Sequence, residues 1–228
     1  MFFDLARSAR IVLDIGAHVG YFALLAAHAN RDGKVYAFEP LPRVYERLQR
    51  NVALNKVPNL TCLPLAVGAE SGVAEFFHVS RGIPSTSSLS REFMEEIYDL
   101  QLEQQEALHS RLTSCQVDVV TIDEFLTDDE NRMVDLVKLD TETTEDAALR
   151  GMAHTIEQSR PVIVCEILKD RAANLIEDLL RPLGYQYFLL TASGPAPRAR
   201  ITPEFPWFNH VFSPEERSPL DLRMAPSP

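Results

Sequence analysis

Three carboxylates fall at positions where the side chains of an α/β protein can do chemistry. Glu39, Asp140 and Glu166 each close a mainly apolar run that is typical of a buried strand. Ligands of open α/β sheets bind outside the carboxyl ends of the strands, so we expect the three side chains to face one crevice. A single acid at a strand end is most simply a solvated residue, but three together indicate a functional site.

A glycine turn near the start of the chain indicates a nucleotide-binding unit. An apolar strand that contains Asp14 precedes Gly16 and Gly20. Residues 21–27 follow as a helix that is apolar on nearly every face, so we expect it to be packed inside the fold. The glycines let the backbone approach a ligand, and the helix start offers free N–H groups. Glu39 lies nineteen residues after Gly20, where such units bind ribose hydroxyls.

The spacing of the glycines favours S-adenosylmethionine over a dinucleotide. A dinucleotide site needs G-x-G-x-x-G, because the pyrophosphate sits on the end of the helix. Here Gly16 and Gly20 are separated by three residues, and Asp14 stands two residues upstream. A carboxylate beside the turn repels phosphate and suits the sulfonium and ammonium groups of S-adenosylmethionine. An ordinary α/β turn is the alternative, but strand, turn, helix and acidic strand end all agree on a cofactor site.

Composition and charge limit the classes of protein to which the chain can belong. The chain has 228 residues, 46% of them hydrophobic and 24% charged, which is typical of a soluble globular enzyme with a sizeable core. The net charge of −11 argues against binding to nucleic acid or to an anionic membrane. No apolar run approaches the roughly 18 residues that span a bilayer, and residues 1–4 do not resemble a signal peptide. We therefore expect a cytoplasmic protein, and its three cysteines fit a reducing compartment.

Alternating strands and helices predict a doubly wound, mostly parallel sheet with helices on both faces, in one domain over residues 1–228. Residues 80–112 are predicted to form an insertion that covers the substrate, and residues 213–228 a poorly ordered tail.

The individual elements follow from local pattern. Thr143 and Asp146 predict a capping box at the start of a helix. Strands are expected at residues 11–15, 34–39, 59–67, 73–79, 115–122, 134–140, 161–166, 185–190 and 207–212, helices at 19–30, 42–56, 91–112, 144–157 and 171–182, and loops at 80–90, 123–132 and 191–206.

Five motifs, in this order along the chain, resemble those of FkbM-type methyltransferases, a class I family. They are Asp-Ile-Gly-Ala-His-Val-Gly at 14–20, Phe-Glu-Pro at 38–40, Thr-Ile-Asp at 121–123, Lys-Leu-Asp-Thr-Glu at 138–142 and Val-Cys-Glu at 164–166. The resemblance covers residues from about 10 to 168 and, more weakly, 209–212. It implies a seven-stranded Rossmann-like sheet whose last strand runs antiparallel. It also implies S-adenosylmethionine as methyl donor and a small-molecule hydroxyl as acceptor, often on a sugar or a polyketide.

The same resemblance implies roles for individual residues. Asp140 and Glu142 would flank the methyl group. Glu142 is the candidate catalytic base because it lies on the turn after the strand, and Asp140 is the alternative, more suited to positioning the cofactor. The cofactor-binding set is Asp14, Gly16, His18, Gly20, Glu39 and Asp140. Of these, Asp14, Gly16 and Gly20 would line the methionine end and Glu39 the ribose. His18 stands where the family commonly has asparagine.

Several alternatives remain open from the sequence. Thr143 stands where the family usually has glycine, and a side chain there can narrow the space beside the methyl group. A non-catalytic module that binds S-adenosylmethionine is therefore one alternative. A nicotinamide dehydrogenase is another, but neither G-x-G-x-x-G nor Tyr-x-x-x-Lys occurs. Asp140, Glu142 and Glu166 could hold Mg²⁺, but nothing distinguishes a metal cluster from an acidic crevice, and we assign no metal.

Overall fold

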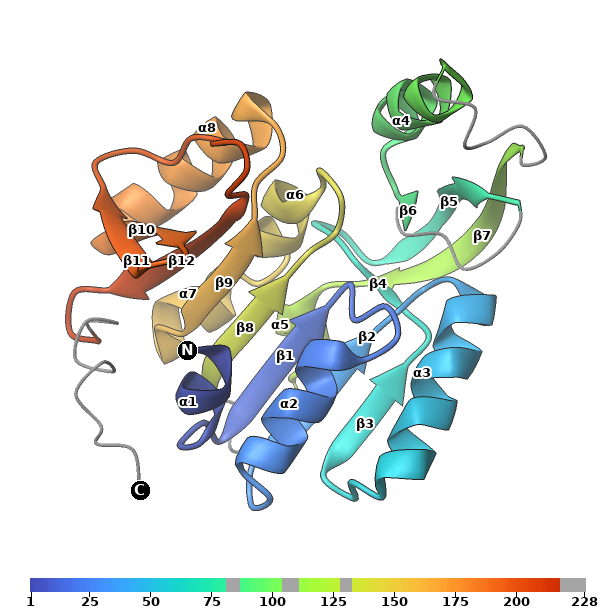
Figure 1. Ribbon diagram of the computed structural model, residues 1–228. Helices are drawn as coiled ribbons and strands as arrows, with labels where there is room; N and C mark the ends of the chain where they lie inside the picture. Colours follow the sequence, from blue (N-terminus) through green and yellow to red (C-terminus); the bar gives the residue numbers. More distant parts are fainter. Residues whose placement is uncertain (81–86, 104–110, 128–132, 218–228) are drawn as a thin grey trace.

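Eight strands form one large, mostly parallel sheet at the centre of the protein (Figure 1). A computed structural model describes residues 1–80, 87–103, 111–127 and 133–217. The spatial order of the strands is β11-β10-β12-β9-β8-β1-β2-β3. Their bounds are β1 Ile11–Ile15, β2 Lys34–Phe38, β3 Leu60–Leu63, β8 Val134–Leu139, β9 Val162–Glu166, β10 Tyr185–Thr191, β11 Gly194–Arg198 and β12 Asn209–Pro214.

The direction of the strands confirms the predicted fold class. Five neighbouring strands, β9, β8, β1, β2 and β3, pair in parallel. The last strand, β12, inserts antiparallel between β9 and β10, as the family resemblance implied. In the parallel part of the sheet the carboxyl ends of the strands meet at one edge, which is where ligands of α/β proteins bind.

The C-terminal part of the sheet differs from the prediction in two ways. Residues 191–206 were predicted to be a loop, but β11 pairs antiparallel with β10 and adds an eighth strand. Its Pro195 and Pro197 fit an edge strand, since proline cannot donate a hydrogen bond to a second neighbour. The poorly ordered tail was predicted to begin at residue 213, but β12 continues to Pro214. Residues 218–228 lie outside the described part of the chain.

Helices cover both faces of the sheet. Val12 packs with Ala23, Ala27 and Leu48 on one face, whereas Leu13 packs with Leu149, Ile156 and Ile176 on the other. This alternation along β1 is the period of two expected for a strand that is buried on both sides. The first group of helices is α1 Phe2–Ala6, α2 Tyr21–Ala29 and α3 Pro42–Asn55, and the second is α5 Ile122–Phe125, α6 Glu145–Arg150, α7 Ala153–Ser159 and α8 Asp170–Leu180, which η1 Arg181–Leu183 extends.

Most predicted helices lie within a few residues of those observed, but the one predicted at 144–157 is two helices, α6 and α7. The break falls at Gly151, where an added Cβ would lie 1.9 Å from the carbonyl oxygen of Gly68, so two backbones meet there. The Asp123 carboxylate then accepts hydrogen bonds from the N–H groups of His154 and Thr155 at 3.0 and 2.8 Å. These bonds satisfy free donors at the start of α7.

Residues 123–132 were predicted to form a loop, but Asp123 lies in α5. Residues 128–132 lie outside the described residues.

A second, four-stranded sheet stands beyond the carboxyl ends of the main strands (Figure 1). Its order is β4-β7-β5-β6, and the bounds are β4 Ala66–Val67, β5 Gly72–Val79, β6 Ser87–Ser88 and β7 Leu112–Val120. Helix α4, Arg91–Glu103, packs on it through Phe93 and Met94 against Phe77. The predicted strand at 59–67 is therefore divided between two sheets, and the helix predicted to reach residue 112 is wrong there, because Leu112 begins β7. Residues 81–86 and 104–110 of the insertion lie outside the described residues.

Within the described part of the chain, no helix combines the length and the apolar character needed to cross a bilayer.

Candidate active site

The turns that follow β1, β2 and β8 enclose one cavity of about 160 Å³. Its wall contains four of the six predicted cofactor residues and the candidate base, namely Gly16, His18, Glu39, Asp140 and Glu142. Two of the predicted residues, Asp14 and Gly20, are not part of the wall. The three turns come from strands that are neighbours in space, which is why residues far apart in the sequence meet here.

Gly16 is required for contact between two of these turns. Its φ is +78°, a left-handed conformation that suits glycine. A Cβ at this position would lie 1.8 Å from the carbonyl oxygen of Asp140. A larger residue at position 16 would therefore push the β1 and β8 turns apart, in addition to filling space beside a ligand. Gly20 also has a positive φ, and an added Cβ there would lie 2.5 Å from the Leu48 side chain.

The Glu39 carboxyl group is held in a fixed orientation at the cavity wall. Oε2 accepts a hydrogen bond from the N–H of His18 at 3.0 Å, and Oε1 accepts one from the N–H of Leu41 at 2.9 Å. Glu39 is 4% exposed, and burial raises its pKa to about 7 against the effect of these two bonds. A ligand that donates hydrogen bonds to Glu39 would stabilise the ionised form.

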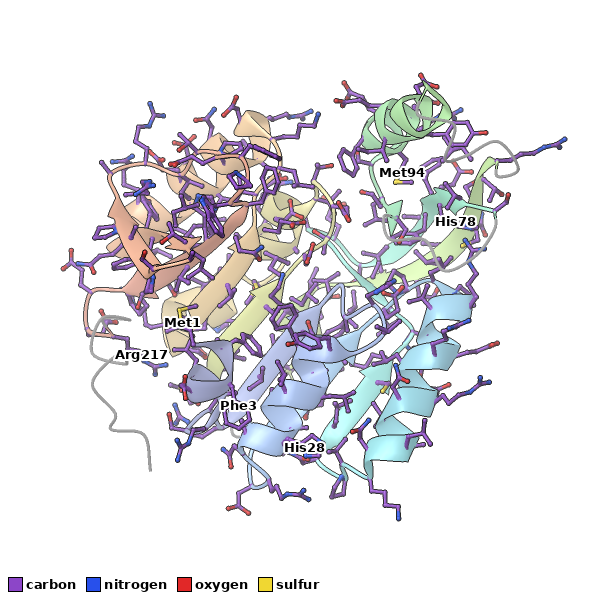
Figure 2. All side chains as sticks on the ribbon, viewed as in Figure 1. Met1, Phe3, His28, His78, Met94 and Arg217 are labelled. Atoms are coloured by element: carbon purple, nitrogen blue, oxygen red, sulfur yellow. The ribbon has the colours of Figure 1, made fainter. Side chains whose placement is uncertain are left out.

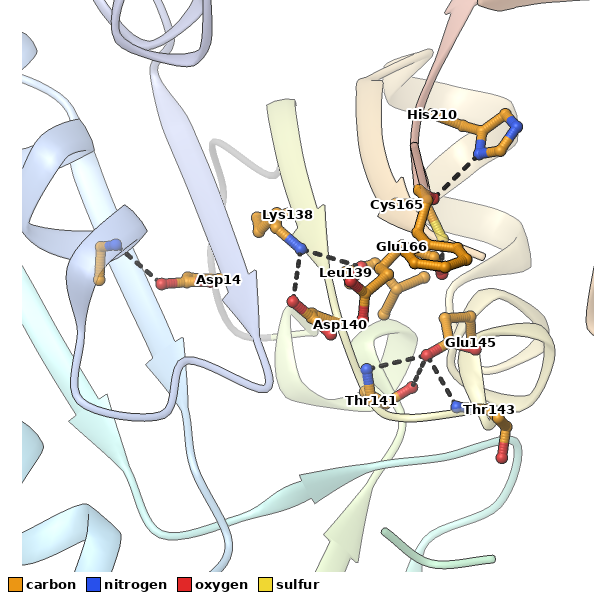
Figure 3. Close-up of polar contacts among 12 residues, drawn as sticks. Asp14, Lys138, Leu139, Asp140, Thr141, Thr143, Glu145, Cys165, Glu166 and His210 are labelled. Atoms are coloured by element: carbon orange, nitrogen blue, oxygen red, sulfur yellow. Dashed lines mark hydrogen bonds and ion pairs between the residues drawn. The ribbon is translucent and has the colours of Figure 1, made fainter. Parts of the chain in front are cut away.

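Asp14 has a different position from the one predicted. Its Oδ2 accepts a hydrogen bond from the N–H of Ala23 at 2.7 Å, within the first turn of α2, as Figure 3 shows. The residue is 1% exposed, and burial raises its pKa to about 7. Asp14 therefore fastens α2 to the sheet, and it is not part of the cavity wall.

Lys138 is a buried cation beside the site. It is 1% exposed, and its Nζ donates a hydrogen bond to Oδ2 of Asp140 at 2.9 Å (Figure 3). The same ammonium lies 5.2 Å from the centre of the Phe22 ring, a cation–π contact. Because a buried charge needs a partner, this pair fixes one oxygen of Asp140. Sequence analysis gave Lys138 no role, although a lysine near the end of an apolar strand was the available signal.

The turn after β8 holds Glu142 in an unusual conformation. Glu142 and Thr143 have φ values of 56° and 78°, and for a β-branched residue such as Thr143 a positive φ is strained. The Oε1 atom of Glu145 accepts hydrogen bonds from the N–H groups of Thr141 and Thr143 at 3.0 and 3.1 Å, and this fastens the turn (Figure 3). The predicted capping box of Thr143 and Asp146 is wrong, since Thr144 is the N-cap of α6 and makes no side-chain cap bond.

Three carboxyl groups meet at this edge of the sheet. Oxygen atoms of Asp140, Glu142 and Glu166 all lie within 4.8 Å of one another. Burial, and then repulsion by Asp140, raise the pKa of Glu142 to about 8 and that of Glu166 to about 7. A group of this kind can take up protons or hold a hard cation. Glu39, Asp140 and Glu166 were predicted to face one crevice. The structure brings Asp140 and Glu166 together, and Glu39 and Asp140 line the cavity, but Glu166 is not part of its wall.

The second sheet contacts the Glu142 turn directly. Ser88 of β6 is fully buried, and its Oγ donates a hydrogen bond to the carbonyl oxygen of Glu142 at 2.6 Å. Its neighbours Ser87 and Leu89 line the cavity. Sequence analysis missed Ser88, because nothing distinguishes it among the five serines between residues 80 and 90.

Comparison with known proteins identifies the family. The model of the methyltransferase FkbM domain matches residues 14–187. The chain belongs to the FkbM methyltransferase family. It is 28% identical over 147 residues to Methyltransferase 1 of Beauveria bassiana, a match that covers 62% of this chain and 57% of that protein. The chain therefore matches less than two thirds of the length of this relative.

Two solved structures have a fold similar to that of this FkbM-family chain. An FkbM methyltransferase from Methylobacillus flagellatus superposes with a TM-score of 0.56 and 17% identity, over 91% of this chain and 44% of the other. A protein from Streptococcus mutans, solved in complex with SAH, superposes with a TM-score of 0.51 and 10% identity, over 92% of this chain and 94% of the other. These likenesses concern the arrangement of the strands and helices.

Proposed function

We propose that the protein transfers a methyl group from S-adenosylmethionine to a hydroxyl group of a small molecule such as a sugar or a polyketide. The observation that carries the proposal is that Glu39, Asp140 and Glu142 line one cavity, in a chain of a methyltransferase family. The solved relative in complex with SAH, the demethylated form of this cofactor, supports the choice of donor.

The residues of the cavity fit this cofactor. Glu39 presents a carboxylate of fixed orientation, which suits the two ribose hydroxyls. Gly16 keeps the β1 and β8 turns in contact, and Asp140, one oxygen of which is paired with Lys138, offers its carboxyl group in the wall as a hydrogen-bond acceptor for the ligand. Bound S-adenosylmethionine would supply a methyl group on a positively charged sulfur, which is a good leaving group.

The chain itself would supply orientation and a base. Methyl transfer to the acceptor oxygen would break the carbon–sulfur bond of the donor and leave its electron pair on sulfur, so a base of the chain would have to take the hydroxyl proton. We assign to Glu142 the role of accepting the hydroxyl proton, because Asp140 is already paired with Lys138. A raised pKa of about 8 suits a general base that acts near neutral pH. Holding the acceptor oxygen about 3 Å from the methyl carbon would provide most of the remaining acceleration.

Titration calorimetry with S-adenosylmethionine and S-adenosylhomocysteine tests the cofactor. Charge-assisted hydrogen bonds contribute about 1.5–3 kcal/mol each, so Glu39→Ala should weaken binding roughly 10- to 100-fold. Glu46→Ala removes an exposed carboxylate of α3 that is not part of the cavity wall, and it should bind as the native protein does. Native affinity in Glu39→Ala, or no binding by the native protein, would contradict the proposal.

Turnover separates an enzyme from a binding module. The native protein is incubated with S-adenosylmethionine and hydroxylated sugars or polyketides, and mass spectrometry follows S-adenosylhomocysteine and a product heavier by one CH₂ group. Tight binding without any methylated product would instead favour the non-catalytic alternative.

A further inference from the structure

A second cavity of about 380 Å³ adjoins the first at Thr144, which lines both. It lies between α4, the segment from Thr143 into α6, and the start of α8, so the inserted helix forms one of its walls. The cavity is close to Glu142, since Thr143 is part of its wall. No part of the proposed cofactor site explains a space of this size beside the candidate base.

The wall of the second cavity is polar, and its charges balance. Its three cationic residues are Arg150, Lys169 and Arg171, and its three acidic residues are Glu92, Glu96 and Asp146. Three hydroxyl residues, Ser90, Thr143 and Thr144, complete the polar wall, and Phe93, Ala147 and Ala172 are its apolar members.

Two ion pairs join four of these six charged side chains. Nζ of Lys169 lies 2.7 Å from Oε1 of Glu96, and an Arg150 nitrogen lies 2.5 Å from Oδ2 of Asp146. The Lys169–Glu96 pair joins the start of α8 to α4 across the cavity. Paired charges of opposite sign present both donors and acceptors without a net field. Such a wall suits a neutral molecule with many hydroxyl groups better than a large apolar or a strongly charged one.

Thr143 is a strained residue at the junction of the cavities. Its φ of 78° costs free energy for a β-branched side chain, and strain of this kind is commonly retained at functional sites. Its N–H is held by Glu145, and in Figure 3 its side chain points away from the Glu145 carboxyl group. Within the described residues, no hydrogen bond involves its hydroxyl, so that group is available to a ligand.

We infer that the second cavity binds the methyl acceptor, that this acceptor is a neutral, hydroxyl-rich molecule of the sugar type, and that Thr143 helps to select it. The inference rests on the proposed function and narrows it, because an apolar polyketide would bury its surface against paired charges. Desolvating those charges without replacing their hydrogen bonds is costly.

The first test compares two classes of acceptor with the native protein. Methyl glycosides of common hexoses represent the sugar class, and macrolactones such as erythronolide B represent the polyketide class. Formation of S-adenosylhomocysteine with the glycosides alone is expected. Turnover with the macrolactones alone would overturn the inference and leave the proposed function standing. Binding of the cofactor without turnover on either class would count against both.

The second test uses side chains of the cavity wall. Thr143→Gly is compatible with the positive φ and should fold at least as well as the native protein. If the Thr143 hydroxyl bonds the acceptor, the acceptor KM should rise roughly 3- to 10-fold with cofactor affinity unchanged, and Thr143→Val should show the same rise. An unchanged acceptor KM in both variants would contradict a role for Thr143.

Filling the cavity provides an independent measurement. Ala147→Phe places a ring in the second cavity and should abolish turnover on the glycosides while cofactor binding, measured by calorimetry, persists. Ala53→Phe is the matched control, because Ala53 is an exposed alanine of α3 that lines neither cavity. Equal turnover in the two variants would exclude this cavity as the acceptor site.

Discussion

At the scale of single residues, the candidate site contains a carboxyl group, that of Glu142, whose backbone conformation is uncommon and whose neighbours are also acidic. Glu142 has a positive φ, is partly buried, and has a carboxyl oxygen within 4.8 Å of oxygens of two further acids, Asp140 and Glu166. The backbone of its turn is held by Glu145 on one side and by Ser88 on the other. These contacts orient the backbone of the turn. Because burial and the neighbouring Asp140 raise the pKa of the Glu142 carboxyl group to about 8, Glu142 is suited to take up a proton.

We predict that Glu142→Gln lowers the turnover number by at least about 10²-fold, because the substitution keeps the shape of the side chain and removes the base. Steady-state kinetics would measure the loss, and calorimetry should show cofactor affinity close to that of the native protein. Glu157→Gln, at an exposed position of α7, is the control. Full turnover in Glu142→Gln would exclude it as the base, whereas lost cofactor binding would make it a cofactor ligand.

The pH dependence of the reaction identifies the base in a second way. A general base acts only when deprotonated, and the pKa of Glu142 is about 8. Therefore kcat/KM should rise with pH and level off above about pH 8, as rates between about pH 6 and about pH 10 would show. A rate that is already constant at the acid end of this range would point to a base of ordinary carboxyl pKa.

At the scale of elements, the second sheet contacts the candidate site directly. The strands β5 and β7 pair antiparallel and carry β6 to the Glu142 turn. The main sheet supplies the acids, and β6 supplies the donor that holds their turn. The fully buried Ser88 bonds the backbone of the candidate base, a contact that an insertion lying apart from the site would lack.

Ser88→Ala tests this connection. Removing the hydroxyl leaves the carbonyl oxygen of Glu142 without its donor, at a cost of about 1–3 kcal/mol. We expect kcat to fall by roughly tenfold or more and the pH profile to shift, because the position of Glu142 changes. Ser114→Ala removes a hydroxyl that bonds the exposed Glu75 on the same sheet and should leave kcat and the profile unchanged. A loss of thermal stability without a change in the pH profile would reduce Ser88 to a purely structural residue.

At the scale of the whole molecule, burial of acids couples stability to pH. The pKa values of Asp14, Glu39 and Glu145 are raised to about 7, as is that of Glu166, and Glu142 reaches about 8. In each case burial is the largest cause, because it penalises the charged form. The folded protein therefore binds more protons than the unfolded chain between the ordinary carboxyl pKa values and about pH 8.

Stability of the ligand-free protein should consequently be highest at acid pH and should fall as the pH rises from about 4.5 to about 8. We predict a melting temperature at pH 8 that is lower by at least about 2–4 °C than at pH 5. Differential scanning calorimetry measures it, and Glu142→Gln should reduce the pH dependence, since the group with the highest of these pKa values is gone. A melting temperature that rises steadily over this range would contradict the assignment of these raised pKa values.

The sequence by itself determined the features that depend on local pattern. Apolar runs placed the strands of the parallel sheet, Gly16 and Gly20 placed the first turn, and the acids that end strands placed Glu39 and Asp140 in one cavity. These features follow from the period of a strand and from the rule that parallel strands end at one edge, so no knowledge of distant contacts is required.

The tertiary structure alone decided what depends on contacts between distant segments. Gly72 pairs with Val119 in the second sheet, and pairing across so long an insertion leaves no periodic signal. The contact of Gly16 with Asp140, the burial of Asp14 against α2 and the bond from Ser88 to Glu142 likewise appear only when strands from different parts of the chain are adjacent. The second cavity belongs to this class, because three segments that are separate in sequence form its wall.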